Sequence, residues 1–401
     1  MPGETDPSRR THPAGPNGPK PSDEPVSPLG RLVGFHKARH EMDEVFAPDK
    51  ASLFHPGEVA LQRSLGVAGR MAEVGGRIIR DVLPEQHRRF YEQLPFILAA
   101  SVDKAGDVWP TLLEGRPGFI HTLHEREIVV GALPGRDDPT AVGIRANGAV
   151  GLLGIELGSR RRNRANGLVR AVGQDSFSLL VSQSFGNCPQ FIRRRDIVDA
   201  SGARNPVRPR AVTFDHLAPT ARAIIERADT FFVASYAERG GSREVDVSHR
   251  GGRPGFVRVG AEGILTIPDF AGNFFFNTLG NFLVNPRAGL LFVDFESGDL
   301  LQLAGTARII TDSPEIAAFK GAQRLWTFHP KRIVLRPQAT GLRWRAAQGG
   351  ISRRTLATGT WDEAARGARG QGTGGSGQEG GEGRAYTSPK ALPSHGQGDD
   401  R

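Results

Sequence analysis

The sequence predicts a mainly β fold with inserted helices, of the α+β class, built from two tandem antiparallel barrels of about 120 residues each. Two observations predict it: three segments recur in the same order, and short apolar runs alternate with glycine-containing turns. The recurring segments are PFILAAS (95–101) with TFFVASY (230–236), GRPGF (115–119) with GRPGF (252–256), and AVGLLGIEL (149–157) with RAGLLFVDF (287–295). Their offsets of 135, 137 and 138 residues are nearly constant, which convergent strand composition, the alternative, rarely produces.

Each copy is expected to contain short strands rich in Val, Ile, Leu and Phe. The expected strands are FILAASV, FIHTL, EIVVGAL, GLLGIEL and SLLVSQ in the first copy and FFVASY, FVRV, ILTI, GLLFVDF and LLQLAGTARII in the second. The expected helices are 84–94, 137–147, 214–228 and 276–286. Pro84 suits the first turn of a helix, and Pro286 ends one because the residue before a proline avoids the helical conformation.

Both ends of the chain are predicted to be disordered tails. Residues 1–30 contain eight prolines and few large apolar side chains, and residues 346–401 contain 14 glycines. Such segments cannot bury enough apolar surface to offset the entropy lost on ordering them. The expected organisation is a disordered tail (1–45), a first barrel with N-terminal helices (46–205), a second barrel (206–345) and a disordered glycine-rich tail (346–401).

Composition and charge exclude several classes of protein. No apolar run reaches the ~18 residues of a membrane helix, and the polar N-terminus cannot be the apolar part of a signal peptide. The single cysteine, Cys188, excludes an intrachain disulfide and a cysteine-rich zinc site. The net charge of +9 falls within residues 31–345, because the two tails carry −1 and +1. We therefore expect a soluble, cytoplasmic protein whose folded part binds an anion.

The densest loop is SHRGGRPGFVRV (248–259), which leads into ILTIPDFAGNFFFNTLGN (264–281). Its three arginines surround glycines whose missing Cβ lets a ligand approach the backbone. Asn273, Asn277 and Thr278 stand near the start of the helix that follows, where the helix dipole favours phosphate oxygens. The alternative is a tight hairpin with solvated arginines.

A second basic cluster, SRRRNRANG (159–167), holds four arginines in six positions of a predicted strand. Such a strand repels itself unless anions or carboxylates oppose it, so it could reach a cofactor phosphate if the two copies pack as a pseudo-dimer. The alternatives are a solvated edge strand that blocks aggregation and a nucleic-acid site, which the lack of interleaved aromatic residues disfavours. Cys188 is interpreted as a small buried residue, and His249 as the one histidine placed to contact a ligand. We find no catalytic or metal-binding pattern.

The second copy contains the motifs SHRGGRPGFVRV, ILTIPDFAGN, NPRAGLLF and LLQLAGTARI. Together they resemble the pyridoxamine 5′-phosphate oxidase-like, FMN-binding split-barrel superfamily. FHPGEVALQ, LPFILAASVDKAGDVWPTLLEGRPGF, SRRRNRANG and SFGNCPQFI resemble the two-copy members of its flavin-nucleotide-binding branch. The resemblance covers residues 50–345. It implies a six-stranded split barrel that pairs with a second barrel as a pseudo-dimer and binds FMN at their interface.

Only some of the family's site residues are present at the matching positions of this sequence. In GRPGFV, Arg253 stands near the arginine of the family's site, but Val257 stands where the oxidases have a lysine. Asn277 and Thr278 replace an Arg-Lys pair that holds the phosphate, and Gln302 lies two residues beyond the position of a flavin-contacting glutamine. These departures argue against true pyridoxamine phosphate oxidation, because lost cations weaken phosphate binding. The candidate cofactor-binding residues are Arg250, Arg253, Arg258, Pro268, Asn273, Asn277, Thr278, Gln302, Arg162 and Arg164.

The function that the resemblance implies is that of an FMN-binding, oxidoreductase-like protein that transfers hydride or electrons through flavin N5, with no catalytic side chain identified. Asp137 and Asp138 fall at the phosphate region of the first copy, so the second copy is expected to provide the phosphate loop. The alternative is a non-catalytic split barrel that binds or senses a flavin, a deazaflavin or haem. The expected partners are a small-molecule substrate, a separate electron donor or reductase, and a second copy of the chain in a homodimer; we expect no membrane partner.

Overall fold

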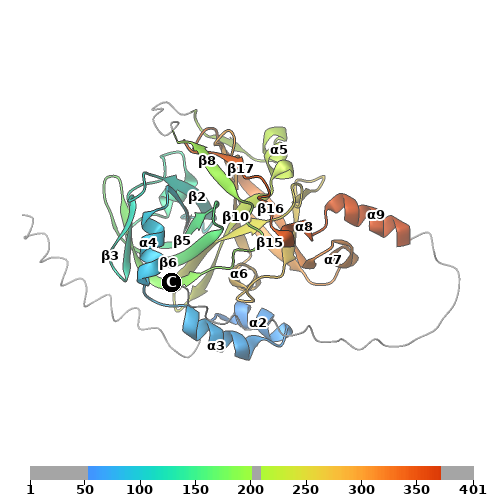
Figure 1. The fold of residues 1–401 in the computed structure, drawn as a ribbon, viewed down its shortest axis with the longest axis horizontal. Coiled ribbons are helices and arrows are strands. Elements are labelled where there is room, and N and C mark those ends of the chain that lie inside the picture. Colours follow the sequence, from blue (N-terminus) through green and yellow to red (C-terminus); the bar gives the residue numbers. More distant parts are fainter. Residues whose placement is uncertain (1–52, 201–208, 372–401) are drawn as a thin grey trace, which may run out of the picture. The chain divides into compact units, whose positions relative to one another are not determined.

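The computed structural model describes residues 53–200 and 209–371, which belong to one compact unit. Antiparallel strands form most of it and helices lie around them, as Figure 1 shows. The mainly β fold with inserted helices is therefore confirmed. The tail predicted at 1–45 and the last residues of the predicted C-terminal tail lie outside the described residues. None of the helices in the described ranges is long and apolar enough to cross a membrane.

The strands form two large antiparallel sheets and one small sheet. The first large sheet contains β1 (Phe96–Val102), β2 (Val108–Glu114), β3 (Ile120–His124), β4 (Glu127–Val130), β5 (Ala149–Glu156), β6 (Arg161–Val172) and β7 (Phe177–Gly186). The second contains β10 (Thr230–Arg239), β11 (Ser242–Gly251), β12 (Arg258–Val259), β13 (Leu265–Phe270), β14 (Arg287–Val293), β15 (Leu300–Ile310) and β16 (Ala322–Arg336), with β9 (Val212–Phe214) beside β16. The small sheet pairs β8 (Arg195–Asp199) with β17 (Arg343–Ala346).

The two large sheets have the same strand order. It is β2-β1-β5-β6-β7-β4-β3 in the first and β11-β10-β14-β15-β16-β13-β12 in the second. Both sheets also shift register at a glycine, Gly167 in β6 and Gly305 in β15. A Cβ would lie 1.9 Å from the carbonyl oxygen of Leu180 at the first glycine and 2.0 Å from that of His329 at the second. Because only glycine permits this approach of the neighbouring strand, the same local bend is built twice.

The three largest hydrophobic clusters of the described residues are one in each large sheet and one between the two sheets. Side chains along β1 and β10 alternate between these clusters, because successive residues of a strand point to opposite faces. Ile97 and Ala99 join the cluster of the first sheet, and Phe231 and Val233 join that of the second. The residues that meet in the shared cluster are Phe96, Leu98, Ala100 and Val102 of β1 and Phe232, Ala234 and Tyr236 of β10.

The strand pairing corrects the alignment of the first recurring segment. Ala100 pairs with Gly151, and Ala234 pairs with Gly289 in the corresponding ladder, so equivalent positions lie 134 residues apart. The sequence comparison gave 135 for this segment. The difference matters because a shift of one residue exchanges the two faces of a strand.

The two GRPGF loops form the same turn. A Cβ at Gly115 would lie 2.3 Å from the Phe119 ring, and one at Gly252 would lie 2.4 Å from the Phe256 ring. In each turn the phenylalanine N–H also donates to the arginine carbonyl three residues earlier. The interpretation that Gly252 makes room for a ligand is therefore wrong, because the space beside it is filled by the loop's own phenylalanine.

Three of the four predicted helices lie near their predicted positions, as α4 (Glu85–Glu92), α5 (Pro219–Arg227) and α6 (Asn277–Val284). The described residues also form helices whose bounds were not predicted: α2 (Pro56–Ser64), α3 (Ala68–Ile78), α7 (Pro314–Ala318), α8 (Arg353–Leu356) and α9 (Trp361–Gln371). The helix predicted at 137–147 is only a four-residue 3-10 turn, η1 (Pro139–Val142). It ends at Gly143, where a Cβ would lie 2.4 Å from the hydroxyl of Ser101. Glycine also disfavours helix continuation.

The predicted C-terminal tail begins too early. Residues 346–371 include α8 and α9, and α9 starts against the second sheet. The indole N–H of Trp361 donates to the Phe256 carbonyl at 2.8 Å, and the Arg253 guanidinium pairs with Glu363 at 3.0 Å. The stretch is rich in glycine, and its composition therefore predicted a tail. Composition does not show that single residues such as Trp361 and Glu363 anchor it to the second sheet.

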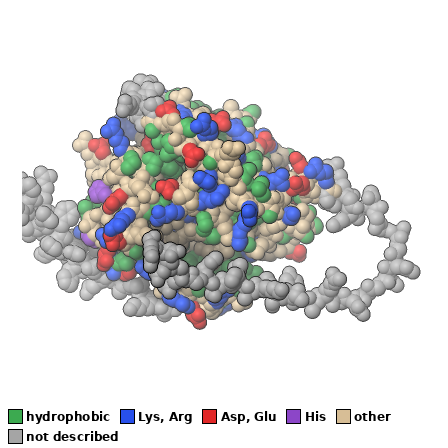
Figure 2. Space-filling view, viewed as in Figure 1, with side chains coloured by type: hydrophobic (Ala, Val, Ile, Leu, Met, Phe, Trp, Pro, Cys, Tyr) green, Lys and Arg blue, Asp and Glu red, His purple; other side chains and the backbone are tan. Residues whose placement is uncertain are grey.

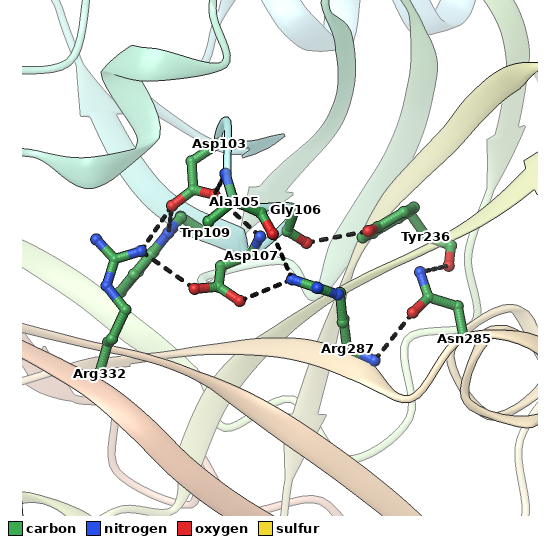
Figure 3. Close-up of polar contacts among 9 residues, drawn as sticks. All are labelled: Asp103, Ala105, Gly106, Asp107, Trp109, Tyr236, Asn285, Arg287 and Arg332. Atoms are coloured by element: carbon green, nitrogen blue, oxygen red, sulfur yellow. Dashed lines mark hydrogen bonds and ion pairs between the residues drawn. The ribbon is translucent and has the colours of Figure 1, made fainter.

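A polar contact joins the β1–β2 turn of the first sheet to the second sheet, as Figure 3 shows. Arg332 of β16 donates to the carboxylates of Asp103 (2.7 Å) and Asp107 (3.1 Å). Arg287 of β14 also reaches Asp107 at 3.1 Å, and the Tyr236 hydroxyl donates to the Gly106 carbonyl. These bonds fix the two sheets in one relative position.

Helix α2 packs against α6 through two glycines, and the two helices lie side by side in Figure 1. A Cβ at Gly57 would lie 2.1 Å from the Gly280 carbonyl oxygen, and one at Gly280 would lie 2.6 Å from Glu58 Cγ. The absence of both side chains lets the helix backbones touch.

Replacing Gly57 with alanine is therefore expected to push α2 away from α6 and to cost about 1–3 kcal/mol, as overpacking does. Hydrogen–deuterium exchange should show faster exchange over residues 56–64. The matched control is Gly69→Ala on α3, where an added Cβ has no neighbour within 4 Å in the described structure. Equal exchange in both variants would contradict the predicted contact.

Candidate functional site: an arginine pocket between the sheets

A pocket lies where the two large sheets meet beside α6. Its walls come from the ends of β11 and β13 and the start of α6, and from β6 and the segment after β7 on the other side. The cavity volume is about 110 Å³. That is below the ~300–1,000 Å³ of pockets that enclose a whole small molecule, so it suits one polar group of a larger ligand.

Seven of the ten predicted site residues line this cavity, which we call the arginine pocket. They are Arg162, Arg164, Arg250, Pro268, Asn273, Asn277 and Thr278. The basic strand reaches it because β6 crosses the end of β11: Arg164 donates to the Val247 carbonyl at 3.2 Å and to the Ser248 hydroxyl. The structure thus brings together two clusters that lie about 90 residues apart in the sequence.

Positive charge exceeds negative charge around the pocket. Four arginines meet only two carboxylates there: Arg162, Arg164, Arg250 and Arg324 with Asp246 and Asp269. The Nε atoms of Arg164 and Arg250 are buried and have no hydrogen-bond partner among the described residues. On the face drawn in Figure 2, by contrast, Lys and Arg side chains are scattered among acidic and hydrophobic ones.

Burial shifts the pKa values of these charged groups. It raises the pKa of Asp246, against the lowering effect of Arg164 and Arg250, and likewise that of Asp269. Burial lowers the pKa of Arg162 to about 10, so this arginine stays charged at neutral pH. A cluster of buried cations with few carboxylates attracts an anion.

His249 and Cys188 also line the pocket. His249 is buried, and its Nε2 makes no hydrogen bond within the described ranges. Burial, together with the nearby Arg162 and Arg250, holds the pKa of His249 well below its usual range, so its ring is neutral. Cys188, predicted to be buried, is half-buried, and its carbonyl accepts a 2.8 Å bond from Arg162 Nε.

The loop before α6 is held in an uncommon conformation. Phe274 and Phe276 have φ values of 63° and 62°, in the left-handed region that side chains disfavour. The Asn273 side chain accepts a 3.2 Å bond from the Phe275 N–H, which fixes this loop. The Asn277 side chain turns toward α2 and donates to Glu58 Oε1 at 2.6 Å. Asn277 is thereby held by a helix outside the pocket.

Three predicted site residues lie elsewhere. Arg253 pairs with Glu363 of α9, and Arg258 pairs with Glu315 of α7 at 2.5 Å while stacking on the Trp361 ring. Gln302 is fully buried and donates to the Pro110 carbonyl and to Asp138, both at 2.9 Å. These three side chains do not line the arginine pocket, because each contacts a partner that is distant in the sequence.

Sequence reasoning missed several contributors to the site. Asp269 pairs with Arg250 and Arg324, yet it lies inside the quoted motif ILTIPDFAGN. Glu58, which holds Asn277, lies inside FHPGEVALQ. Each of these carboxylates lies within a motif that carries the family resemblance, which is the sequence signal that could have identified it.

Residues 217–342 match the sequence model of the pyridoxamine 5′-phosphate oxidase family. This segment is a domain of the pyridoxamine 5′-phosphate oxidase-like split-barrel superfamily. It contains strands β10 to β16 of the second sheet, and α6 with its half of the arginine pocket. The resemblance predicted from the sequence is thus confirmed for this superfamily.

Solved structures with some likeness to the chain include HupZ of Group A Streptococcus (18% identity, 29% of this chain and 90% of that one, TM-score 0.23). Others are a general stress protein 26-related protein of the pyridoxinephosphate oxidase family from Clostridium acetobutylicum (15%, 32% and 92%, TM-score 0.23) and the heme storage protein HutZ of Vibrio cholerae (15%, 30% and 95%, TM-score 0.22). No curated protein matches the chain. The assignment to the split-barrel superfamily therefore rests on the match over residues 217–342.

Proposed function

We propose that the arginine pocket holds the phosphate of FMN and that the protein is an oxidoreductase of the pyridoxamine phosphate oxidase class. The observation that carries this is the surplus of two positive charges: Arg162, Arg164 and Arg250 line the pocket with one carboxylate, Asp269, and the adjacent Arg324 and Asp246 cancel each other. A phosphate monoester carries a charge between −1.5 and −2 at neutral pH, which this excess of two matches.

The residues present fit such a group. Buried Nε donors of Arg164 and Arg250 lack partners within the described structure, and a phosphate has oxygens to accept from them. Gly272 faces open space, so the loop before α6 leaves room for the rest of the cofactor. When bound, FMN supplies hydride chemistry, and the chain's residues hold and orient it. Substrate and electron donor would be separate molecules.

The proposal includes two tandem split barrels that pack as a pseudo-dimer. The identical strand order of the two sheets, the glycine bend repeated in β6 and β15, and the cluster shared by β1 and β10 support it. The arginine pocket draws residues from both halves, as an interface site would. On this view the charge of the basic strand serves the site of the other half, and no second chain is needed to complete it.

A second candidate is haem binding without catalysis, because the neutral His249 ring lines the pocket with an unbonded Nε2 in the described structure. Neutral imidazole is a common haem-iron ligand. Absorption spectra distinguish the two, since a Soret band marks haem and flavin bands mark FMN. A Soret band that shifts in His249→Ala would favour this second candidate.

Arg250→Ala is expected to weaken FMN binding about 10–100-fold, because one charge-assisted hydrogen bond contributes about 1.5–3 kcal/mol. Quenching of FMN fluorescence on titration measures this affinity. The matched control is Arg253→Ala, which removes an arginine of the same loop that points to Glu363 instead. The proposal fails if purified protein binds no added FMN, or if Arg253→Ala weakens binding as much as Arg250→Ala.

A further inference from the structure

A larger cavity, of about 660 Å³, lies on the other side of the contact between the sheets. Its volume falls within the ~300–1,000 Å³ of pockets that enclose a small molecule. Most of its lining is apolar, including Leu112, Leu113, Leu133, Pro134 and Leu342. We call it the apolar pocket.

The apolar pocket occupies the place that corresponds to the arginine pocket. It is built from the end of β2, the segment after β4 and the Asp138 cap of η1, together with the end of β16 and the segment after it. The arginine pocket uses the end of β11, the end of β13, the start of α6 and the segment after β7. Because the strand order of the two sheets is the same, β2 corresponds to β11, β4 to β13 and β16 to β7.

The charges in the two pockets differ. The apolar pocket is lined by two acidic and two basic side chains, Glu114, Asp138, Arg116 and Arg336, so its net charge is zero. The Asp138 carboxylate accepts a 2.7 Å hydrogen bond from Arg336. The Glu114 carboxylate accepts the Gly341 N–H at 2.8 Å. No surplus cation is left among the described lining residues to hold a phosphate, and the carboxylates would repel one.

One donor of this pocket lacks a hydrogen-bond acceptor. The Arg336 side chain is 8% exposed, and its Nε is 3.7 Å from the Asp137 carboxylate, too far for a hydrogen bond. That Nε has no hydrogen-bond partner within the described residues. A buried N–H without an acceptor is costly, so a ligand oxygen that accepts from it would be favoured.

We propose that the apolar pocket binds an uncharged, mainly apolar small molecule whose carbonyl oxygen accepts a hydrogen bond from Arg336. Leucine and proline side chains supply the contact area for its apolar body, and the neutral charge of the walls selects against phosphorylated compounds. This second site is separate from the arginine pocket and takes a different class of ligand. Neither site needs the other to be filled.

The experiment uses Nile red, a neutral apolar dye with a carbonyl oxygen, and follows its fluorescence during titration of the full chain. Saturable binding is expected, and Ala132→Phe, which fills the apolar pocket, should weaken it at least tenfold. The matched control is Ala271→Phe in the lining of the arginine pocket, which should leave dye binding unchanged. Pro134→Trp, at a half-buried loop position, repeats the test if Ala132→Phe does not fold.

Competition with FMN keeps the two sites distinguishable. Saturating FMN should not displace the dye, and Ala132→Phe should keep its FMN affinity. The inference is overturned if no saturable dye binding occurs, if FMN displaces the dye, or if Ala271→Phe removes binding while Ala132→Phe retains it. Failure of FMN binding with normal dye binding would instead overturn only the function proposed above.

Discussion

Replacing Arg336 with alanine is expected to lower the free energy of unfolding by about 3–5 kcal/mol, the usual effect of removing one partner of a buried ion pair. Arg336 of the second sheet reaches across to Asp138 of the first, whose side chain is only 1% exposed. Asp138 also accepts bonds from Thr111 and Gln302, but those neutral donors cannot balance its charge. Urea denaturation followed by tryptophan fluorescence measures the loss.

Two further variants test whether the loss of stability in Arg336→Ala comes from the uncompensated charge of Asp138. Asp138→Asn in the Arg336→Ala background should recover part of the stability, because the neutral amide keeps an acceptor for Gln302 without a buried charge. Arg77→Ala removes an arginine of an exposed pair on α3, whose side chain is 76% exposed, and should change stability by less than about 1 kcal/mol. If Arg336→Ala costs no more than Arg77→Ala, the buried pair does not stabilise the contact between the sheets.

The fold class was predictable because strand runs and glycine turns recur along the chain, but the register of β1 was not. Every residue of β1 is buried, since one face packs in the first sheet's cluster and the other in the shared cluster. A strand covered on both faces shows no apolar–polar alternation, so the sequence cannot tell its two faces apart. That is why Ala100 and Ala234 were aligned one residue out of place.

The candidate site was predictable where local loops form it. Arg250, Asn273 and Asn277 lie within one 28-residue stretch, and the structure places all three around the pocket. Arg253 and Arg258 do not line the pocket, because their guanidinium groups pair with Glu363 and Glu315. Glu363 lies in a stretch whose composition predicted a tail, so the sequence alone did not indicate a partner for Arg253.

Docking of α2 on α6 is expected to depend on pH, with a plateau between about pH 4.5 and 6.5 and a decline toward pH 8. Burial raises the pKa of Glu58 from 4.5 to about 8, with a contribution from Asp246 and Glu244, and lowers that of His55 from 6.5 to about 4. Both groups are thus neutral in the docked helix, where Glu58 accepts bonds from Asn277 and from the His55 N–H. Each unit of pKa shift corresponds to about 1.4 kcal/mol of differential stability.

The number of protons bound in the docked and undocked states sets the direction in which docking changes with pH. Above pH 6.5 the docked state binds more protons than the undocked one, because Glu58 keeps its proton up to about pH 8, so docking loses at most about 1.4 kcal/mol per pH unit. Below pH 4.5 the undocked state binds more protons through His55, so docking weakens again toward pH 4. Between these limits the two opposite slopes cancel.

Hydrogen–deuterium exchange over residues 56–64, corrected for intrinsic rates, measures this docking at each pH. Glu58→Gln keeps a neutral side chain that can accept from Asn277, so it should remove the decline between pH 6.5 and 8. Because nothing then cancels the opposite slope of His55, docking in this variant should weaken from about pH 6.5 down to pH 4, and the plateau should be lost. Because Asn277 lines the arginine pocket, FMN affinity in the wild type should fall over the same alkaline range and stay level in Glu58→Gln. If docking or FMN affinity still declines between pH 6.5 and 8 in Glu58→Gln, another group causes the pH dependence. The prediction that Glu58 positions Asn277 at the pocket would then be wrong.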